Sequence, residues 1–143
     1  MGFCKPHTNQ KGKGVIYMLY IDMIKGSINQ GKQEVSKIYC CGSSKGFKIG
    51  QTAQKYMCQR LQTIRQYEKD VELYAYVEFT GSKALREFVE SSVRLYMQGK
   101  GYQLQGNDHF IRKGKASTFK RHYMDIVTNT LNALEIDYKV INK

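Results

Sequence analysis

The sequence is poor in acidic residues, in paired cysteines and in long apolar runs. No stretch approaches the about 18 consecutive apolar residues of a transmembrane helix, and the amino-terminus lacks the apolar region of a signal peptide. The four cysteines form no C-x-x-C pair, and the adjacent Cys40 and Cys41 are poorly placed to bind one zinc ion. We therefore expect an intracellular, cytoplasmic protein with reduced thiols and no membrane span.

The scarcity of acidic residues leaves a strong positive charge. Twelve Asp and Glu stand against 23 Lys and Arg, which gives a net charge of +11 and a pI near 9.5. Such an excess favours a polyanionic partner, most often nucleic acid, and the alternative is a basic protein that is merely soluble. Lys5, Lys11 and Lys13 lie in a largely polar opening, so we expect residues 1–13 to form a mobile basic arm.

Residues 14–143 suit a single domain with one core, because they show no internal repeat and no linker. Residues 14–21 (GVIYMLYI) form a nearly continuous apolar run, which is typical of a buried central strand. Residues 22–36 are polar and favour a long loop or the tip of an extended hairpin. Residues 37–41 and 46–49 are short β-prone segments, separated by the turn-forming GSSKG.

Apolar stripes at helical spacing predict helices over about residues 54–67, from Ser82 as N-cap to about Gln98, and over 117–134. Residues 71–79 alternate between apolar and polar side chains, as in a half-buried strand of an antiparallel sheet. The segment IDYKV near the end of the chain also alternates and could add a short strand.

Two charged side chains flank these stripes. Arg60 lies beside the stripe of the first helix, so its stem can pack on the core edge while its guanidinium faces a neighbouring sheet. On position alone, a solvated surface arginine is an equally good interpretation. Glu90 lies near the flank of the second helix, beside Val93, whereas Glu87 faces water. An ordinary surface glutamate is the favoured interpretation of Glu90 when no other evidence is considered.

The stretch Phe47-Lys48-Ile49-Gly50 predicts the end of a strand, and a polar turn follows it. Phe47 and Ile49 share one face, and Lys48 points to the other. A glycine at this position lets the backbone approach a phosphate closely or turn without a Cβ clash.

The order of these features resembles the GIY-YIG nuclease family over about residues 14–110. The resemblance is carried by Gly14-Val15-Ile16-Tyr17, by Lys48-Ile49-Gly50-Gln51-Thr52, and by Arg60 and Glu90 on successive helices. It is closest to the phage and bacterial branch, in which the second motif often reads Lys-Ile-Gly. Asn107-Asp108-His109-Phe110 would then stand for the short aromatic segment that follows the glutamate helix.

The resemblance implies an α/β fold of the α+β type, with a small, mainly antiparallel three-stranded sheet flanked by helices. It also implies metal-dependent hydrolysis of DNA phosphodiester bonds. The resemblance implies that Glu90 holds one Mg²⁺ (or Mn²⁺) and that Arg60 clamps the non-bridging oxygens of the phosphate. It also implies that Tyr17 positions the attacking water and takes its proton. Lys48 stands in the place of the second motif's tyrosine and would contact the phosphate.

Nucleic-acid contacts are expected from Tyr20, Gly50, Gln51, Thr52, Asn107 and His109, and Tyr20 replaces Tyr17 if the register of the first motif is shifted. DNA is the expected partner, with RNA as an alternative, and a phage-encoded protein would act in the cytoplasm of its host cell. Two further hypotheses stay open. One is a domain of the same fold that binds nucleic acid without cutting it, and the other is an RNA-binding or ribosome-associated basic protein.

Overall fold

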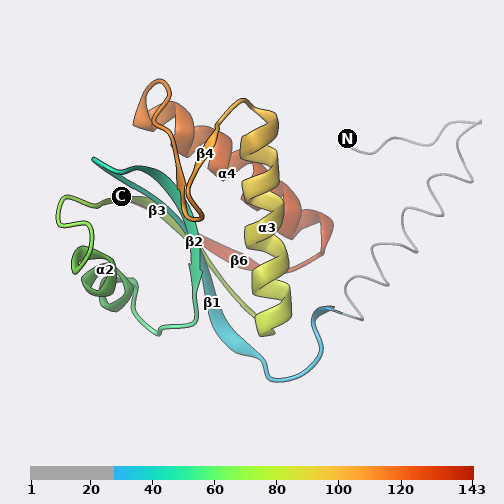
Figure 1. Ribbon diagram of the computed structural model, residues 1–143. Coiled ribbons are helices and arrows are strands. Elements are labelled where there is room, and N and C mark those ends of the chain that lie inside the picture. The colour runs from blue at the N-terminus through green and yellow to red at the C-terminus, as the bar shows by residue number, and fades with distance from the viewer. Residues whose placement is uncertain (1–27) are drawn as a thin grey trace, which may run out of the picture.

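The computed structural model describes residues 28–143, so the predicted arm 1–13 and the predicted strand 14–21, with Tyr17 and Tyr20, lie outside the described residues. The described elements follow the chain as β1 (Glu34–Ser43), β2 (Gly46–Thr52), α2 (Met57–Arg65), β3 (Glu72–Gly81), α3 (Lys83–Gly99), β4 (Leu104–Gln105), β5 (His109–Phe110), α4 (Ala116–Ala133) and β6 (Tyr138–Asn142) (Figure 1). None of these helices is long and apolar enough to cross a membrane.

The strands form one antiparallel sheet in the order β4-β5-β2-β1-β3-β6. The mixed class of helices and antiparallel strands is as predicted, but the sheet is larger than the three strands expected. β1, β2 and β3 form its centre, β6 extends it beside β3, and the two-residue strands β4 and β5 extend it beside β2. Strands of two residues are too short to show an alternating pattern, which is why the sequence does not reveal them.

The two faces of the sheet carry different helices. Helices α3 and α4 pack on one face over the main apolar core, and α2 lies on the other (Figure 1). The side chains alternate accordingly along β1, where Ile38 and Cys40 enter the main core while Tyr39 and Cys41 face α2. The face under α2 therefore has a smaller core, which leaves room for polar side chains beside it.

The predicted helices agree with the structure to within a few residues. Ser82 caps α3 as expected, because its hydroxyl accepts a hydrogen bond from the Leu85 amide at 3.1 Å. The predicted loop 22–36 is too long at its carboxyl end, since β1 begins at Glu34. The carboxylate of Glu34 binds Arg86 Nη1 at 2.9 Å, and this contact with α3 holds the first residue of the strand in place.

Two buried cations fix the connections around β2. Lys37 is 1% exposed, and its Nζ donates to the carbonyl oxygens of Gln54 and Lys55, both at 2.8 Å, which fixes the segment that leads from β2 into α2. Arg86 donates from Nε to the Gln51 amide oxygen at 2.5 Å and thereby ties α3 to β2. These contacts set the position of α2 and α3 relative to the strand between them.

Candidate active site

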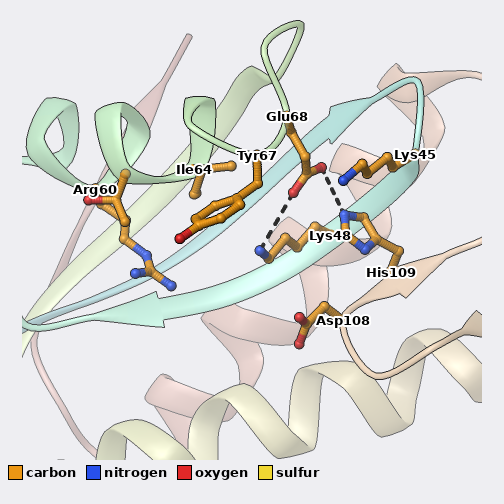
Figure 2. Close-up of a pocket in the computed structure, with 9 residues that line it drawn as sticks. Lys45, Lys48, Arg60, Ile64, Tyr67, Glu68, Asp108 and His109 are labelled. Carbon is orange, nitrogen blue, oxygen red and sulfur yellow. Dashed lines mark hydrogen bonds and ion pairs between the residues drawn. The ribbon is translucent and has the colours of Figure 1, made fainter.

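A cavity of about 260 Å³ lies on the α2 side of the sheet, where the short strand β5 meets β2 (Figure 2). β5 pairs with β2 only through Phe47 and Lys48, so the outer edge of β2 has no strand partner from Ile49 onward among the described residues. The cavity is lined mostly by charged and polar side chains: Lys45, Lys48, Arg60, Thr63, Ile64, Tyr67, Glu68, Asp108 and His109.

Arg60 reaches this edge from α2 and contacts a tyrosine. Its Nε donates a hydrogen bond to the Tyr39 hydroxyl at 3.1 Å, and its guanidinium carbon lies 6.0 Å from the centre of the Tyr39 ring. Arg60 is half-buried, so the interpretation in which its guanidinium faces the neighbouring sheet agrees with the geometry. Because Nε is engaged, the two terminal nitrogens are left to bind an anion.

Gly50 makes room for Tyr39. The two residues are directly opposite each other in the β1–β2 ladder, and a Cβ at Gly50 would come within 2.3 Å of the Tyr39 ring carbon Cζ and hydroxyl oxygen. The ring therefore lies across the glycine, and only a residue without a side chain fits beneath it. This gives a structural reason for the Ile49-Gly50 pair, namely the placement of a tyrosine on the adjacent strand.

Tyr39 is fully buried, and its burial is the main reason that the pKa of its hydroxyl is raised. The hydrogen bond and the positive charge of Arg60 oppose this effect, and the negative charge of Glu90 adds to it. The phenol consequently keeps its proton at neutral pH.

A second group of contacts surrounds Glu68, which follows α2. Glu68 is 6% exposed, and its Oε1 accepts hydrogen bonds from Ser43 Oγ at 2.7 Å and from His109 Nε2 at 2.8 Å. Its Oε2 lies 3.9 Å from Lys48 Nζ, and Figure 2 shows the carboxylate directed between the lysine and the histidine. Burial would raise the pKa of Glu68, but the bonds from Ser43 and His109, with the charges of His109 and Lys48, hold it below its usual value.

Glu90 is half-buried on α3, and its pKa is shifted in the opposite direction to that of Glu68. Among the described residues it has no hydrogen bond or ion pair. Its pKa is raised, first by burial and then by repulsion from Glu87 and Asp108, against the attraction of Arg94 and Lys48. No group of three or more His, Cys, Asp or Glu side chains converges within the described part of the chain, so a metal ion held by Glu90 would complete its shell with water and substrate oxygens, as Mg²⁺ commonly does.

The remaining predicted contact residues lie apart from this cavity or face outward. The Gln51 side chain binds Arg86, and the Thr52 hydroxyl is buried against Gln54, so both help to hold the strand and the turn. Asn107 is exposed, and its backbone carbonyl accepts a hydrogen bond from Arg94 Nη2 at 2.5 Å. Of the predicted residues in the described part of the chain, the structure thus gathers Lys48, Arg60 and His109 around the cavity, whereas Glu90 of α3 is not among its lining residues.

Sequence reasoning missed two residues of this site. Tyr39 could have been found, because the segments on either side of GSSKG were both predicted to be strands, and a hairpin centred on that turn pairs residue 39 with residue 50. Glu68 had no such signal, since it lies in a polar stretch and acquires its partners only through contacts with residues distant in the chain. Comparison of the chain with models of protein families, with curated proteins and with solved structures finds no match.

Proposed function

We propose that the protein is a metal-dependent endonuclease of the GIY-YIG type that hydrolyses phosphodiester bonds of DNA, with Tyr39 as the tyrosine of its site. The observation that carries the proposal is the contact between Tyr39 of β1 and Arg60 of α2, beside a cavity that Arg60 and Lys48 of β2 both line. Arg60 contacts Tyr39 directly at 3.1 Å. Burial is the main cause of the raised pKa of both Tyr39 and Glu90, and the charge of Glu90 adds to the first while the charge of Lys48 opposes the second.

In this proposal Ile38-Tyr39 takes the part that the sequence suggested for Ile16-Tyr17. The argument is that β1 and β2 are paired directly and that Tyr39 lies opposite Gly50 in the second motif. The hairpin between the two motifs is then short, since β1 ends at Ser43 and β2 begins at Gly46. Tyr17 itself lies outside the described residues, so its own role stays a prediction.

The positive side chains would bind the scissile phosphate. The two terminal nitrogens of the planar Arg60 guanidinium can bind two non-bridging oxygens of the phosphate at once. The hydrogen bond to Tyr39 holds the guanidinium in place. Lys48, on β2, adds a second positive charge beside the phosphate. Its Nζ lies 3.9 Å from Glu68 Oε2, which is longer than a hydrogen bond, so a phosphate can compete for it. Both charges would favour the transition state, in which negative charge builds up on the phosphoryl oxygens.

Glu90 fits the role of metal ligand, because it is a half-buried carboxylate without a cationic partner among the described residues, and its pKa is raised as a result. A divalent cation beside Glu90 would stabilise the ionised carboxylate, which burial otherwise disfavours. Held by Glu90, Mg²⁺ would act as a Lewis acid toward the phosphoryl group and stabilise the leaving oxygen. Tyr39 keeps its proton and is fully buried, so its part in this proposal is to hold Arg60 in place rather than to remove a proton.

The test is nicking of supercoiled plasmid by the purified protein with Mg²⁺ or with a chelator. Cleavage should require Mg²⁺ and should be lost in Glu90→Ala. Glu87→Ala is the matched control, because Glu87 lies on the same helix with its side chain 51% exposed, and it should cleave as the wild type does. DNA binding measured by gel shift on the same samples should persist in both variants.

The second candidate is a domain that holds nucleic acid without cutting it. It is favoured by Lys48 in a tyrosine's place and by the raised pKa of Tyr39, which together remove an easily ionised phenol from the site. Binding without any Mg²⁺-dependent cleavage would support it and contradict the endonuclease. Cleavage and affinity should also be compared on duplex DNA and structured RNA, because a strong preference for RNA would favour the RNA-binding hypothesis.

A further inference from the structure

The contact between Glu68 and His109 has no part in the roles assigned above. It lies in the same cavity as Lys48 and Arg60, and in Figure 2 the histidine lies beyond Lys48 as seen from Arg60. His109 is 17% exposed and comes from β5, where it pairs with Lys48 across the ladder. The nearly buried Glu68 holds it through the 2.8 Å contact to Nε2. The structure thus places a histidine held by a buried carboxylate at the wall of a cavity of about 260 Å³.

The contact decides which nitrogen of the ring carries the proton. The pKa of Glu68 is lowered, so its carboxylate is ionised at neutral pH and acts only as an acceptor. The proton of a neutral His109 ring must then lie on Nε2, and Nδ1, which has no partner among the described residues, presents its lone pair. A carboxylate that orients an imidazole in this way also stabilises the imidazolium once the free nitrogen has taken a proton.

The charged and titratable groups that line the cavity together with His109 come from several elements. The turn between β1 and β2 contributes Lys45, β2 contributes Lys48, α2 and the residues after it contribute Arg60, Tyr67 and Glu68, and the hairpin itself contributes Asp108. Arg94 of α3 reaches the backbone of Asn107 near the same hairpin. Imidazole is the ordinary side chain that takes up and releases a proton near neutral pH. Tyr39, in contrast, is fully buried and holds its proton more tightly than a free phenol.

We propose that His109 is the general base of the hydrolysis and that Glu68 is its positioning residue; this inference rests on the proposed endonuclease function. Nδ1 of His109 accepts a proton from water while the water oxygen forms a bond to phosphorus. The ester bond between phosphorus and the leaving oxygen breaks, and its electron pair stays on that oxygen, which then takes a proton from solvent. His109 returns its own proton to solvent, so that one water is consumed in each cleavage.

The experiment measures single-turnover cleavage of duplex DNA with Mg²⁺ across pH for the wild type, His109→Gln, His109→Ala and Glu68→Gln. The wild-type rate should rise with pH through one acidic limb. His109→Gln should lose this limb and cleave on the order of 100-fold more slowly. Glu68→Gln should move the limb and slow cleavage by about 10-fold. Added imidazole should restore part of the rate of His109→Ala, which a purely structural role for the histidine does not predict.

The control is His122→Ala. His122 lies on α4 and packs against Tyr102 with ring centres 6.0 Å apart, away from the cavity residues, and its variant should keep the wild-type rate and pH profile. A His109→Gln protein that cleaves at nearly the wild-type rate with an unchanged profile overturns the general base and leaves the endonuclease intact. His109→Ala that imidazole does not restore, with Glu68→Gln unchanged in profile, also overturns it. A wild-type protein without Mg²⁺-dependent cleavage overturns the proposed function and this inference together.

Discussion

Two glutamates of the proposed site, Glu68 and Glu90, have surroundings that shift their pKa values in opposite directions. Glu68, on the α2 side, is bound by Ser43 and His109 and has Lys48 within 3.9 Å, so its pKa lies below the usual range. Glu90, on α3, has no hydrogen bond or ion pair among the described residues, and its pKa is raised. A carboxylate with partners stabilises the fold at neutral pH, whereas one without them costs stability and is available to a ligand. In the proposed function, Glu68 is accordingly the carboxylate that positions its neighbours, and Glu90 is the one proposed to bind the cation.

Replacing Arg60 should have the largest effect, because it removes the guanidinium that lines the cavity and binds Tyr39. Arg60→Ala should slow plasmid cleavage by on the order of 100-fold, since transition-state charge is no longer stabilised. DNA affinity should fall far less, because other basic residues share the phosphate contacts. Arg65→Ala is the matched control, as Arg65 is an exposed residue of the same helix. Equal losses of cleavage and binding in Arg60→Ala would contradict a catalytic role.

Gly50→Ala should displace Tyr39, whose hydroxyl binds Arg60. The new Cβ would meet the Tyr39 ring within 2.3 Å, so the ring must move and its bond to Arg60 must break. We expect a loss of about 1–3 kcal/mol in the free energy of unfolding, measured in urea, together with slower cleavage. Gly99→Ala is the control, because nothing lies within 4 Å of a Cβ there and Gly99 ends a helix. A Gly50→Ala protein as stable as the wild type would show that Tyr39 does not need the glycine.

Glu68→Gln should reduce the free energy of unfolding by about 1–2 kcal/mol at neutral pH, since buried partners lose a charged acceptor. The folded-state pKa of Glu68 is lowered from 4.5, so its contribution is complete above that pH and is lost as the pH falls through the folded pKa. The difference between variant and wild type should therefore shrink below about pH 4.5. Unfolding of both proteins in denaturant at neutral and acidic pH measures this difference in free energy. A difference that does not change with pH would contradict a stabilising role for the ionised Glu68 carboxylate.

Glu90→Gln should have the smallest effect on stability and the opposite sign. The folded-state pKa of Glu90 is raised above 4.5, so the ionised carboxylate destabilises the fold above that value, and the penalty disappears below the unfolded pKa. Without Mg²⁺, the variant should be slightly more stable than the wild type at neutral pH and equal to it in acid. A neutral-pH stability lower than that of the wild type would show that Glu90 has structural partners of its own.

Sequence patterns were sufficient for the long elements and for part of the site. α3, α4 and β3 have regular apolar spacing over many residues, so their positions could be predicted. The resemblance named Lys48 and Arg60, which line the cavity, and Glu90, whose role stays a prediction. The tyrosine was harder because the chain contains Ile-Tyr twice, at residues 16–17 and 38–39. The strand register sets Tyr39 of the second pair opposite Gly50, which is the reason for choosing it in the proposal, whereas residues 16–17 lie outside the described part of the chain. Glu68 and the two-residue strand of His109 depend on contacts between distant segments and have no local pattern.

The measurement that tests the central claim most directly is the rate of plasmid nicking by wild-type protein and by Glu90→Gln as Mg²⁺ is increased from zero, with DNA binding recorded on the same samples. The account predicts that wild-type nicking rises with Mg²⁺ and saturates, while the variant, which folds and binds DNA, does not nick at any Mg²⁺ concentration. Nicking by Glu90→Gln at the wild-type rate, or a wild-type rate that does not depend on Mg²⁺, would contradict it.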